Sequence, residues 1–260
     1  MANPTAADIL GRVTLVTGPE ECTWGFLDLT GLLGRGVVSV MPTWTNAIQW
    51  EGRRHRETYL EYRQLIQLLL WRNPVPPGGV LVLKSPADTD RIDTFAEVFP
   101  EASFVLTHRD PFRCLTSVVR VGEIINGPFL KPDRSVVGTE GAVPTSTRML
   151  SGGARAMVSA TNDIPERVRS IDYTALMTDP AGTLSTVLES LSIPVDAQKV
   201  HAEVAAFLAG QRSGKRAKPP VEYSDYGIDH EGLLAEADFA AYRQAFGVSL
   251  EGKRLTDPAT

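Results

Sequence analysis

Cysteine is scarce in this sequence, which has only Cys22 and Cys114 among its 260 residues. Their positions match neither the ligand spacing of a zinc site nor a disulfide framework, so we expect two core thiols in a reducing compartment. Long apolar runs are lacking too. No segment is long enough to cross a bilayer, and the first residues lack the apolar stretch of a secretory signal. The sequence therefore predicts a cytoplasmic protein with no membrane partner.

Positive charge is also in short supply. Acidic residues outnumber basic ones by 31 to 26, which gives a net charge of −5. A broad cationic surface for nucleic acid or anionic lipid is therefore not expected, and any anion site has to be local. The length allows one substantial α/β domain with its own core, and we expect a single domain over residues 1–260.

Hydrophobic periodicity predicts alternating helices and strands in the central part of the chain. Apolar residues recur on one helical face between His55 and Arg72, whereas the continuous apolar run Val80–Leu83 is typical of a strand buried on both faces. A helix over 90–99, a strand over 103–107 and a helix over 111–125 follow. This alternation predicts a doubly wound α/β fold with a parallel sheet.

Glycine, proline, serine and threonine dominate between Asn126 and Thr147, so we expect a mobile loop at 126–147 of the kind that covers a ligand. The other predicted elements are helices over 20–33, 148–162, 181–191, 197–209 and 233–246 and a short strand over 167–171.

The stretch SFVLTHRDPFRCLTS, residues 103–117, places a cation at the end of a predicted strand. Ligands of an open α/β sheet bind beyond the carboxyl ends of the strands, which is where Arg109 lies. Its guanidinium is a planar fork of donors that matches a phosphate, and Ser117 can supply another donor to the same group. The alternative is that Arg109 pairs with Asp110 or Asp90 at the surface while Ser117 only packs.

Several motifs of the chain resemble the sulfotransferases. LKSP at 83–86, FPEASFVLTHRDP at 99–111 and Ser117 are similar to the central block of that family, in particular its bacterial branch with LKSP, FPDA and THRDP motifs. The same branch is echoed by PEECTW at 19–24, YLEYRQLIQLLLWRNP at 59–74, IDYTALMTDP at 171–180, YSDYGID at 223–229 and AAYRQAFG at 240–247. The order and spacing of these motifs are specific, and the resemblance covers most of the chain.

The resemblance implies a P-loop-NTPase-like doubly wound parallel sheet flanked by helices. It implies 3′-phosphoadenosine-5′-phosphosulfate as sulfuryl donor, a small-molecule hydroxyl or amine as acceptor, and no metal. In the family, the residues that match Arg109 and Ser117 hold the 3′-phosphate of the donor. The lysine that matches Lys84 stabilises the sulfuryl group and the leaving phosphate. Lys215 and Arg216 match the family's late basic loop, which closes over the nucleotide.

Simpler roles stay open for some of these residues. Lys84 can be a strand-end lysine that reaches solvent, and Lys215 and Arg216 can belong to an ordinary basic linker. Asp88 stands where the bacterial branch has the histidine of LKSPAH. Its carboxylate is a candidate base for the acceptor hydroxyl, and the alternative is a helix N-cap before Asp90.

One motif of the family is missing from its expected place. Members carry a PRSGTT-type loop that cradles the 5′-phosphosulfate with backbone amides and a basic side chain. In this chain the nearest stretch, VTLVTGPEECTWGFL at 13–27, has glutamates in the positions of the basic residue and the serine. We therefore expect the amino-terminal strand and phosphosulfate loop to be absent, with a degenerate loop at 13–27 as the alternative.

Three functions compete at this point. The first is a sulfotransferase that uses the donor named above, and the second is a truncated or non-catalytic sulfotransferase-like protein that binds the nucleotide or acts as a scaffold. The third, a small-molecule kinase, is disfavoured because the sequence has no GxxxxGK[ST] loop.

Overall fold

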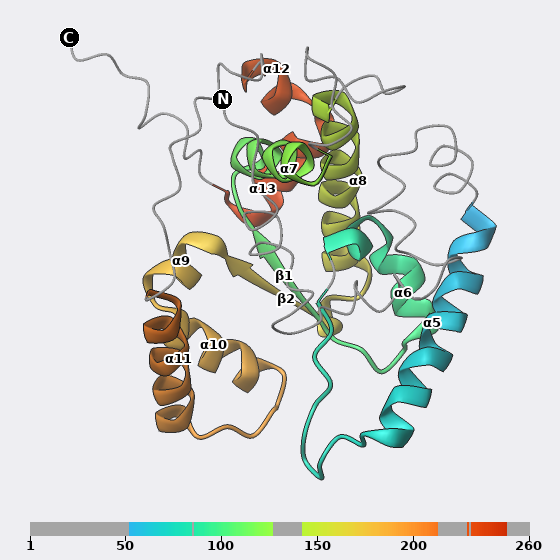
Figure 1. The fold of residues 1–260 in the computed structure, drawn as a ribbon. Helices are drawn as coiled ribbons and strands as arrows, with labels where there is room; N and C mark the ends of the chain where they lie inside the picture. The colour runs from blue at the N-terminus through green and yellow to red at the C-terminus, as the bar shows by residue number, and fades with distance from the viewer. Residues whose placement is uncertain (1–51, 85, 127–141, 213–227, 229, 249–260) are drawn as a thin grey trace. The chain divides into compact units, whose positions relative to one another are not determined.

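The computed structural model describes residues 52–84, 86–126, 142–212, 228 and 230–248 (Figure 1). The chain divides into two compact units, the first made of residues 1–101 and 117–156 and the second of residues 102–116 and 157–260. The predicted helix over 20–33 and the candidate loop at 13–27 lie outside the described residues. None of the helices in the described ranges has the length and apolar character needed to span a membrane.

The first unit is helical in its described part. It contains α5 (Gly52–Arg72), the 3₁₀ helix η2 (Pro86–Arg91) and α6 (Ile92–Val98), and it shares α7 (Pro111–Asn126) and α8 (Ala142–Asp163) with the second unit. α5 confirms the helix predicted from His55 to Arg72. The helix predicted over 90–99 is present as η2 followed by α6.

Aromatic side chains join α5 to α6. Tyr59 of α5 meets Phe95 edge-on with 5.2 Å between ring centroids, and Tyr62 meets Phe99 in the same way at 6.2 Å. Phe95 and Phe99 stack on each other at 4.5 Å. All four side chains are buried, and Tyr59 has no exposed surface. Each such aromatic pair contributes about 0.5–1.5 kcal/mol beyond the burial of its area.

α8 approaches η2 closely at a glycine. Gly153 of α8 lies so near Thr89 of η2 that a Cβ at residue 153 would be 3.3 Å from the Thr89 Cγ2 atom. A side chain at residue 153 would therefore require the Thr89 side chain to shift. The absence of a side chain there lets α8 pack directly against the segment that carries Asp88.

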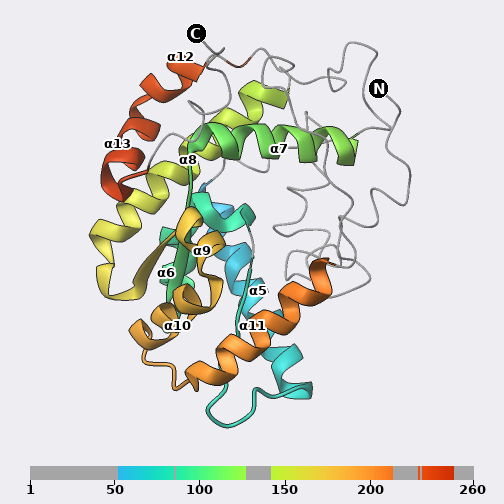
Figure 2. The same cartoon turned by 90° about the vertical axis from the view of Figure 1, so that its left-hand side faces the viewer.

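The second unit contains the sheet. Its elements are β1 (Phe104–His108), η4 (Pro165–Arg167), β2 (Val168–Asp172), α9 (Tyr173–Thr178), α10 (Pro180–Ser190), α11 (Ala197–Arg212), α12 (His230–Ala235) and α13 (Ala237–Phe246). β1 and β2 pair in parallel, from Phe104 opposite Val168 to His108 opposite Asp172. α9 and α10 follow β2, and α10 packs with α11 (Figure 2). The parallel pair flanked by helices confirms the predicted α/β class.

The strand predicted over Val80–Leu83 is wrong. These residues have no regular secondary structure, and the sheet of the described residues consists of β1 and β2. Val82 is 82% exposed, whereas a central strand would be buried. An apolar run forms a strand only where a neighbouring strand takes its backbone hydrogen bonds, so the run alone does not decide the structure.

The other boundaries differ little from expectation. The two remaining predicted strands each begin and end one residue later than predicted, at β1 and β2. α8 begins at Ala142, so the last part of the loop predicted over 126–147 is helical, and residues 127–141 lie outside the described residues.

Candidate functional site at the carboxyl end of the strands

Five polar or aromatic residues follow or end the two paired strands. His108 ends β1 and is followed by Arg109 and Asp110, while Asp172 ends β2 and is followed by Tyr173. His108 lies opposite Asp172 in the parallel register, so both strand ends reach the same edge of the sheet. This edge is where an open α/β sheet binds ligands.

Arg109 is held through both its main chain and its side chain. Its backbone N–H donates to the Tyr242 hydroxyl at 3.0 Å, and the same hydroxyl donates to the Arg109 carbonyl oxygen at 3.3 Å. The guanidinium carbon lies 4.2 Å from the centroid of the Tyr173 ring. A cation over an aromatic face gains about 0.5–2 kcal/mol, depending on its exposure. The arginine therefore has a defined place at the sheet edge.

Tyr242 keeps its proton in this setting. Its side chain is buried, with 5% of the residue exposed. Burial raises the pKa of the hydroxyl well above its usual value, although the hydrogen bond with the Arg109 backbone acts in the opposite direction. The hydroxyl is therefore neutral near pH 7 and can accept and donate at the same time.

His108 is a buried imidazole beside this contact. Its ring stacks on Phe246 with 5.0 Å between centroids, and its Nδ1 atom lies 3.9 Å from a carboxylate oxygen of Asp172. Burial lowers the pKa of His108, while the charge of Asp172 partly offsets that effect.

Asp110 begins the helix that follows. The residue is 1% exposed, and its carboxylate accepts the backbone N–H of Phe112 at 3.0 Å. Its carbonyl oxygen accepts the N–H of Cys114 at 3.1 Å. With Pro111 as the first residue of α7, Asp110 acts as a helix N-cap. The aspartate and proline of the THRDP motif thus fix the direction of the chain directly after Arg109.

The Asp88 carboxylate has a hydrogen-bond partner that the sequence did not predict. It lies in the first turn of η2, and its carboxylate accepts a hydrogen bond from the Tyr59 hydroxyl at 2.8 Å. The N-cap position of α6 is occupied by Arg91, so Asp88 does not cap that helix. The Tyr59 side chain is fully buried, and its hydroxyl holds one oxygen of the Asp88 carboxylate.

The structure places the remaining predicted site residues as follows. Lys84 is exposed in the irregular segment before η2, so the interpretation of Lys84 as a strand-end residue is wrong. Ser117 is exposed on α7. Both belong with Asp88 to the first unit, whereas Arg109 belongs to the second. Lys215 and Arg216 lie outside the described residues.

Three tyrosines at these contacts were not predicted from the sequence. Tyr59, Tyr173 and Tyr242 all lie in stretches that carry the family resemblance, which is the signal that could have drawn attention to them. Their partners were not visible, however, because Tyr242 and Arg109 are 133 residues apart in the chain.

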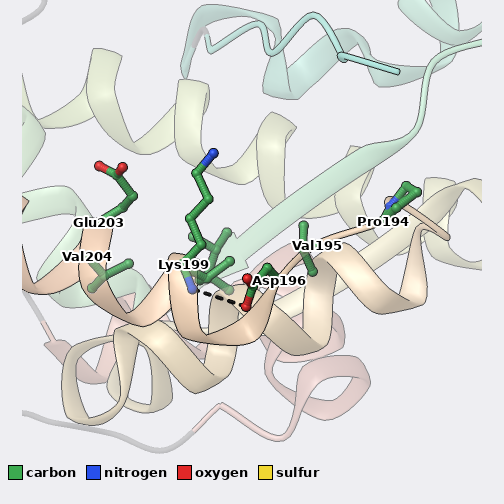
Figure 3. A pocket seen from close by; sticks show the side chains of 8 residues that line it. Pro194, Val195, Asp196, Lys199, Glu203 and Val204 are labelled. Carbon is green, nitrogen blue, oxygen red and sulfur yellow. Dashed lines mark hydrogen bonds between the residues drawn. The ribbon is translucent and has the colours of Figure 1, made fainter. Parts of the chain in front are cut away.

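A groove elsewhere in the second unit contains none of the predicted site residues. It has a volume of about 480 Å³ and lies along α10 and α11. Figure 3 shows Lys199, Glu203 and Val204 of α11 at its wall. Within the described ranges, no group of three or more histidine, cysteine, aspartate or glutamate side chains is placed to hold a metal ion.

The parallel strand pair with its flanking helices defines an α/β protein, and comparison with known proteins gives its family. A sequence model described as "Sulfotransferase family" matches residues 34–197. The chain therefore belongs to the sulfotransferase family. The matched range includes Lys84, Asp88, Arg109 and Ser117, whereas Tyr242 lies beyond it.

Two solved structures are similar to this one. Sulfotransferase STF9 from Mycobacterium avium aligns with a TM-score of 0.61 and 24% sequence identity, over 75% of this chain and 48% of that protein. The chain thus spans about half the length of STF9. The sulfotransferase domain from the curacin biosynthetic pathway aligns at a TM-score of 0.46 and 16% identity, over 72% of this chain and 68% of that one. No curated protein matches the sequence.

Proposed function

We propose that this chain binds 3′-phosphoadenosine-5′-phosphosulfate and transfers its sulfuryl group to a hydroxyl or amine of a small-molecule acceptor in the cytoplasm. Family membership supports the class of reaction. The observation that carries the proposed donor is the arrangement of Arg109, a cation past the carboxyl end of β1 with its backbone held by Tyr242.

Arg109 suits a phosphate because of the way its side chain is held. A guanidinium donates hydrogen bonds from a planar fork, and the Tyr173 ring below its central carbon offers a cation–π contact without the carboxylate oxygens that would compete with a phosphate. A side chain that is already ordered also loses less conformational entropy when it binds. We assign the 3′-phosphate of the donor to Arg109, with the Ser117 hydroxyl as a second donor.

The other proposed roles concern the transfer step. The bound donor supplies an activated sulfuryl group and a bisphosphate leaving group. The Lys84 ammonium would offset negative charge on that leaving group. Asp88 would take the proton of the acceptor, and the hydrogen bond from Tyr59 orients its carboxylate for that purpose. Lys215 and Arg216 would close over the nucleotide.

The experiment is transfer of radiolabelled sulfuryl from the donor to a panel of phenols, alcohols and amines. We expect label in at least one class of acceptor. Asp88→Asn should lower kcat by about a hundredfold or more, because general base catalysis contributes at least that much. The matched control is Asp90→Asn, which changes a neighbouring carboxylate of η2 that is 3.6 Å from Arg91 and should leave kcat nearly unchanged.

The outcomes separate the competing functions. Donor binding without transfer to any acceptor would favour the non-catalytic nucleotide-binding protein. An Asp88→Asn variant with the kcat of the parent would remove Asp88 from the mechanism. Absence of both binding and transfer would contradict the proposed function.

A further inference from the structure

The contact between α13 and the end of β1 has a specific geometry. One hydroxyl, that of Tyr242, bonds both backbone groups of Arg109, accepting from the N–H at 3.0 Å and donating to the carbonyl oxygen at 3.3 Å. The ring centroids of Tyr242 and Phe246 are 5.1 Å apart, and the Phe246 ring stacks on His108 with 5.0 Å between centroids. α13 therefore contacts Arg109 through two hydrogen bonds of Tyr242 and contacts His108 through the stacked ring of Phe246.

We infer that Tyr242 is a positioning residue of the donor site, which sets the affinity for the 3′-phosphate by fixing the backbone of Arg109. This inference rests on the proposed function. It concerns a residue outside the range 34–197 that the family match covers. Tyr242 does not itself touch the phosphate in this account and acts only through Arg109.

The physical basis is the cost of leaving backbone groups without a partner. Removing the hydroxyl takes one acceptor and one donor away from the part-buried backbone of Arg109. The backbone of Arg109 would shift to recover those bonds elsewhere. A shift of the backbone displaces the guanidinium, and phosphate binding by a planar fork of donors depends on its geometry.

The direct test compares two ligands on the full chain by calorimetry. Adenosine 3′,5′-bisphosphate carries the 3′-phosphate, and adenosine 5′-monophosphate lacks it, so the ratio of their affinities isolates the 3′-phosphate. Tyr242→Phe keeps the ring and removes the hydroxyl, and it should reduce this ratio about fivefold or more. The affinity for the monophosphate should stay the same. A ratio within a factor of two of the parent's would overturn the inference.

Two further variants exclude a general loosening of α13. Phe239→Leu disturbs the packing of the same helix at a residue that is 1% exposed, and it should lower the melting temperature without changing the ratio. Arg109→Ala should remove most of the preference for the bisphosphate, and the Ser117 hydroxyl should keep a small remainder. Adding Tyr242→Phe to Arg109→Ala should then cause no additional loss, because Tyr242 acts through Arg109. A further decrease of the affinity ratio in the double variant would show that Tyr242 does not act through Arg109.

A measurement on the unmodified chain covers the case in which Tyr242→Phe does not fold. Coupling between two sites is reciprocal, so the 3′-phosphate should strengthen the hydrogen bond that helps to bind it. Hydrogen exchange of the Arg109 amide should slow more with the bisphosphate than with the monophosphate at equal saturation. Equal slowing would overturn the inference while leaving the proposed function intact. If the unmodified chain binds both nucleotides equally, both proposals fail.

Discussion

His108 is a buried imidazole at the end of β1, between the ring of Phe246 and the carboxylate of Asp172. Its pKa is lowered from the ordinary value of 6.5 because burial penalises the charged form more than Asp172 favours it. As the pH falls through about 6.5, the unfolded chain therefore binds more protons at this histidine than the folded chain does. Protonation of the unfolded state favours unfolding, so stability should fall as the pH falls through this window.

The predicted pH dependence can be measured by urea unfolding at about pH 7.5 and about pH 5.5. His108→Gln cannot titrate, so its free energy of unfolding should decrease less between the two pH values than that of the parent. One proton can contribute at most about 1.4 kcal/mol per pH unit. The control is His201→Gln at an exposed position of α11, which should keep the slope of the parent. If the free energy of unfolding of His108→Gln decreased between the two pH values as much as that of the parent, this account would be contradicted.

At the residue scale, the sequence predicted where single residues lie relative to a strand or helix. It did not predict which distant residues they contact. The sequence placed Arg109 directly after a strand and Pro111 in the first turn of a helix, and both predictions are confirmed. Asp110 was considered as an ion-pair partner, and its role in capping α7 was not predicted. The hydrogen bond from Tyr59 to Asp88 joins residues on separate elements, which short-range sequence patterns do not report.

At the scale of elements, the packing of α5 on α6 supports the segment that carries Asp88. Phe95 is the centre of this packing, since its ring contacts Tyr59 on one side and Phe99 on the other. Arg63 of α5 adds a hydrogen bond to the Val98 carbonyl oxygen at the end of α6. The two helices therefore depend on each other through buried contacts.

Phe95→Ala should lower the free energy of unfolding by about 3–5 kcal/mol, because it removes a buried ring and leaves a cavity. Urea unfolding of the full chain measures this quantity. Leu68→Ala serves as the comparison, since Leu68 is 60% exposed on α5 and should contribute within about 0.5 kcal/mol of zero. A loss below about 1 kcal/mol for Phe95→Ala would show that the interface of α5 and α6 is not a core.

Elements with a strong period or a clear stop were predictable, and an element that depends on a distant neighbour was not. The helix from His55 to Arg72 was found because its apolar face repeats every turn. The run Val80–Leu83 was misassigned because its hydrophobicity says nothing about which strand would pair with it. β1 has the same kind of short apolar sequence, and it is a strand because β2 supplies its hydrogen bonds.

At the scale of the molecule, the described residues form two compact units, and the predicted site residues come from both. The single domain expected over residues 1–260 stays a prediction. The family was predicted from motifs spread along the chain and is confirmed over residues 34–197. The proposed binding of the donor nucleotide goes beyond what the motifs establish, and the proposal rests on one arginine.

The measurement that tests this central claim most directly is thermal unfolding and calorimetry of the parent chain and of Arg109→Lys with adenosine 3′,5′-bisphosphate. Lysine keeps the charge but loses the planar fork of donors, so binding should weaken by about 1–3 kcal/mol. Stability without ligand should change by less than about 1 kcal/mol. Arg148→Lys, at an exposed position of α8, should bind like the parent.

The account predicts that the bisphosphate raises the melting temperature of the parent and of Arg148→Lys by similar amounts, and that of Arg109→Lys by much less. An equal rise in all three proteins would show that Arg109 does not hold the phosphate. No rise in any of them would contradict the proposed donor altogether.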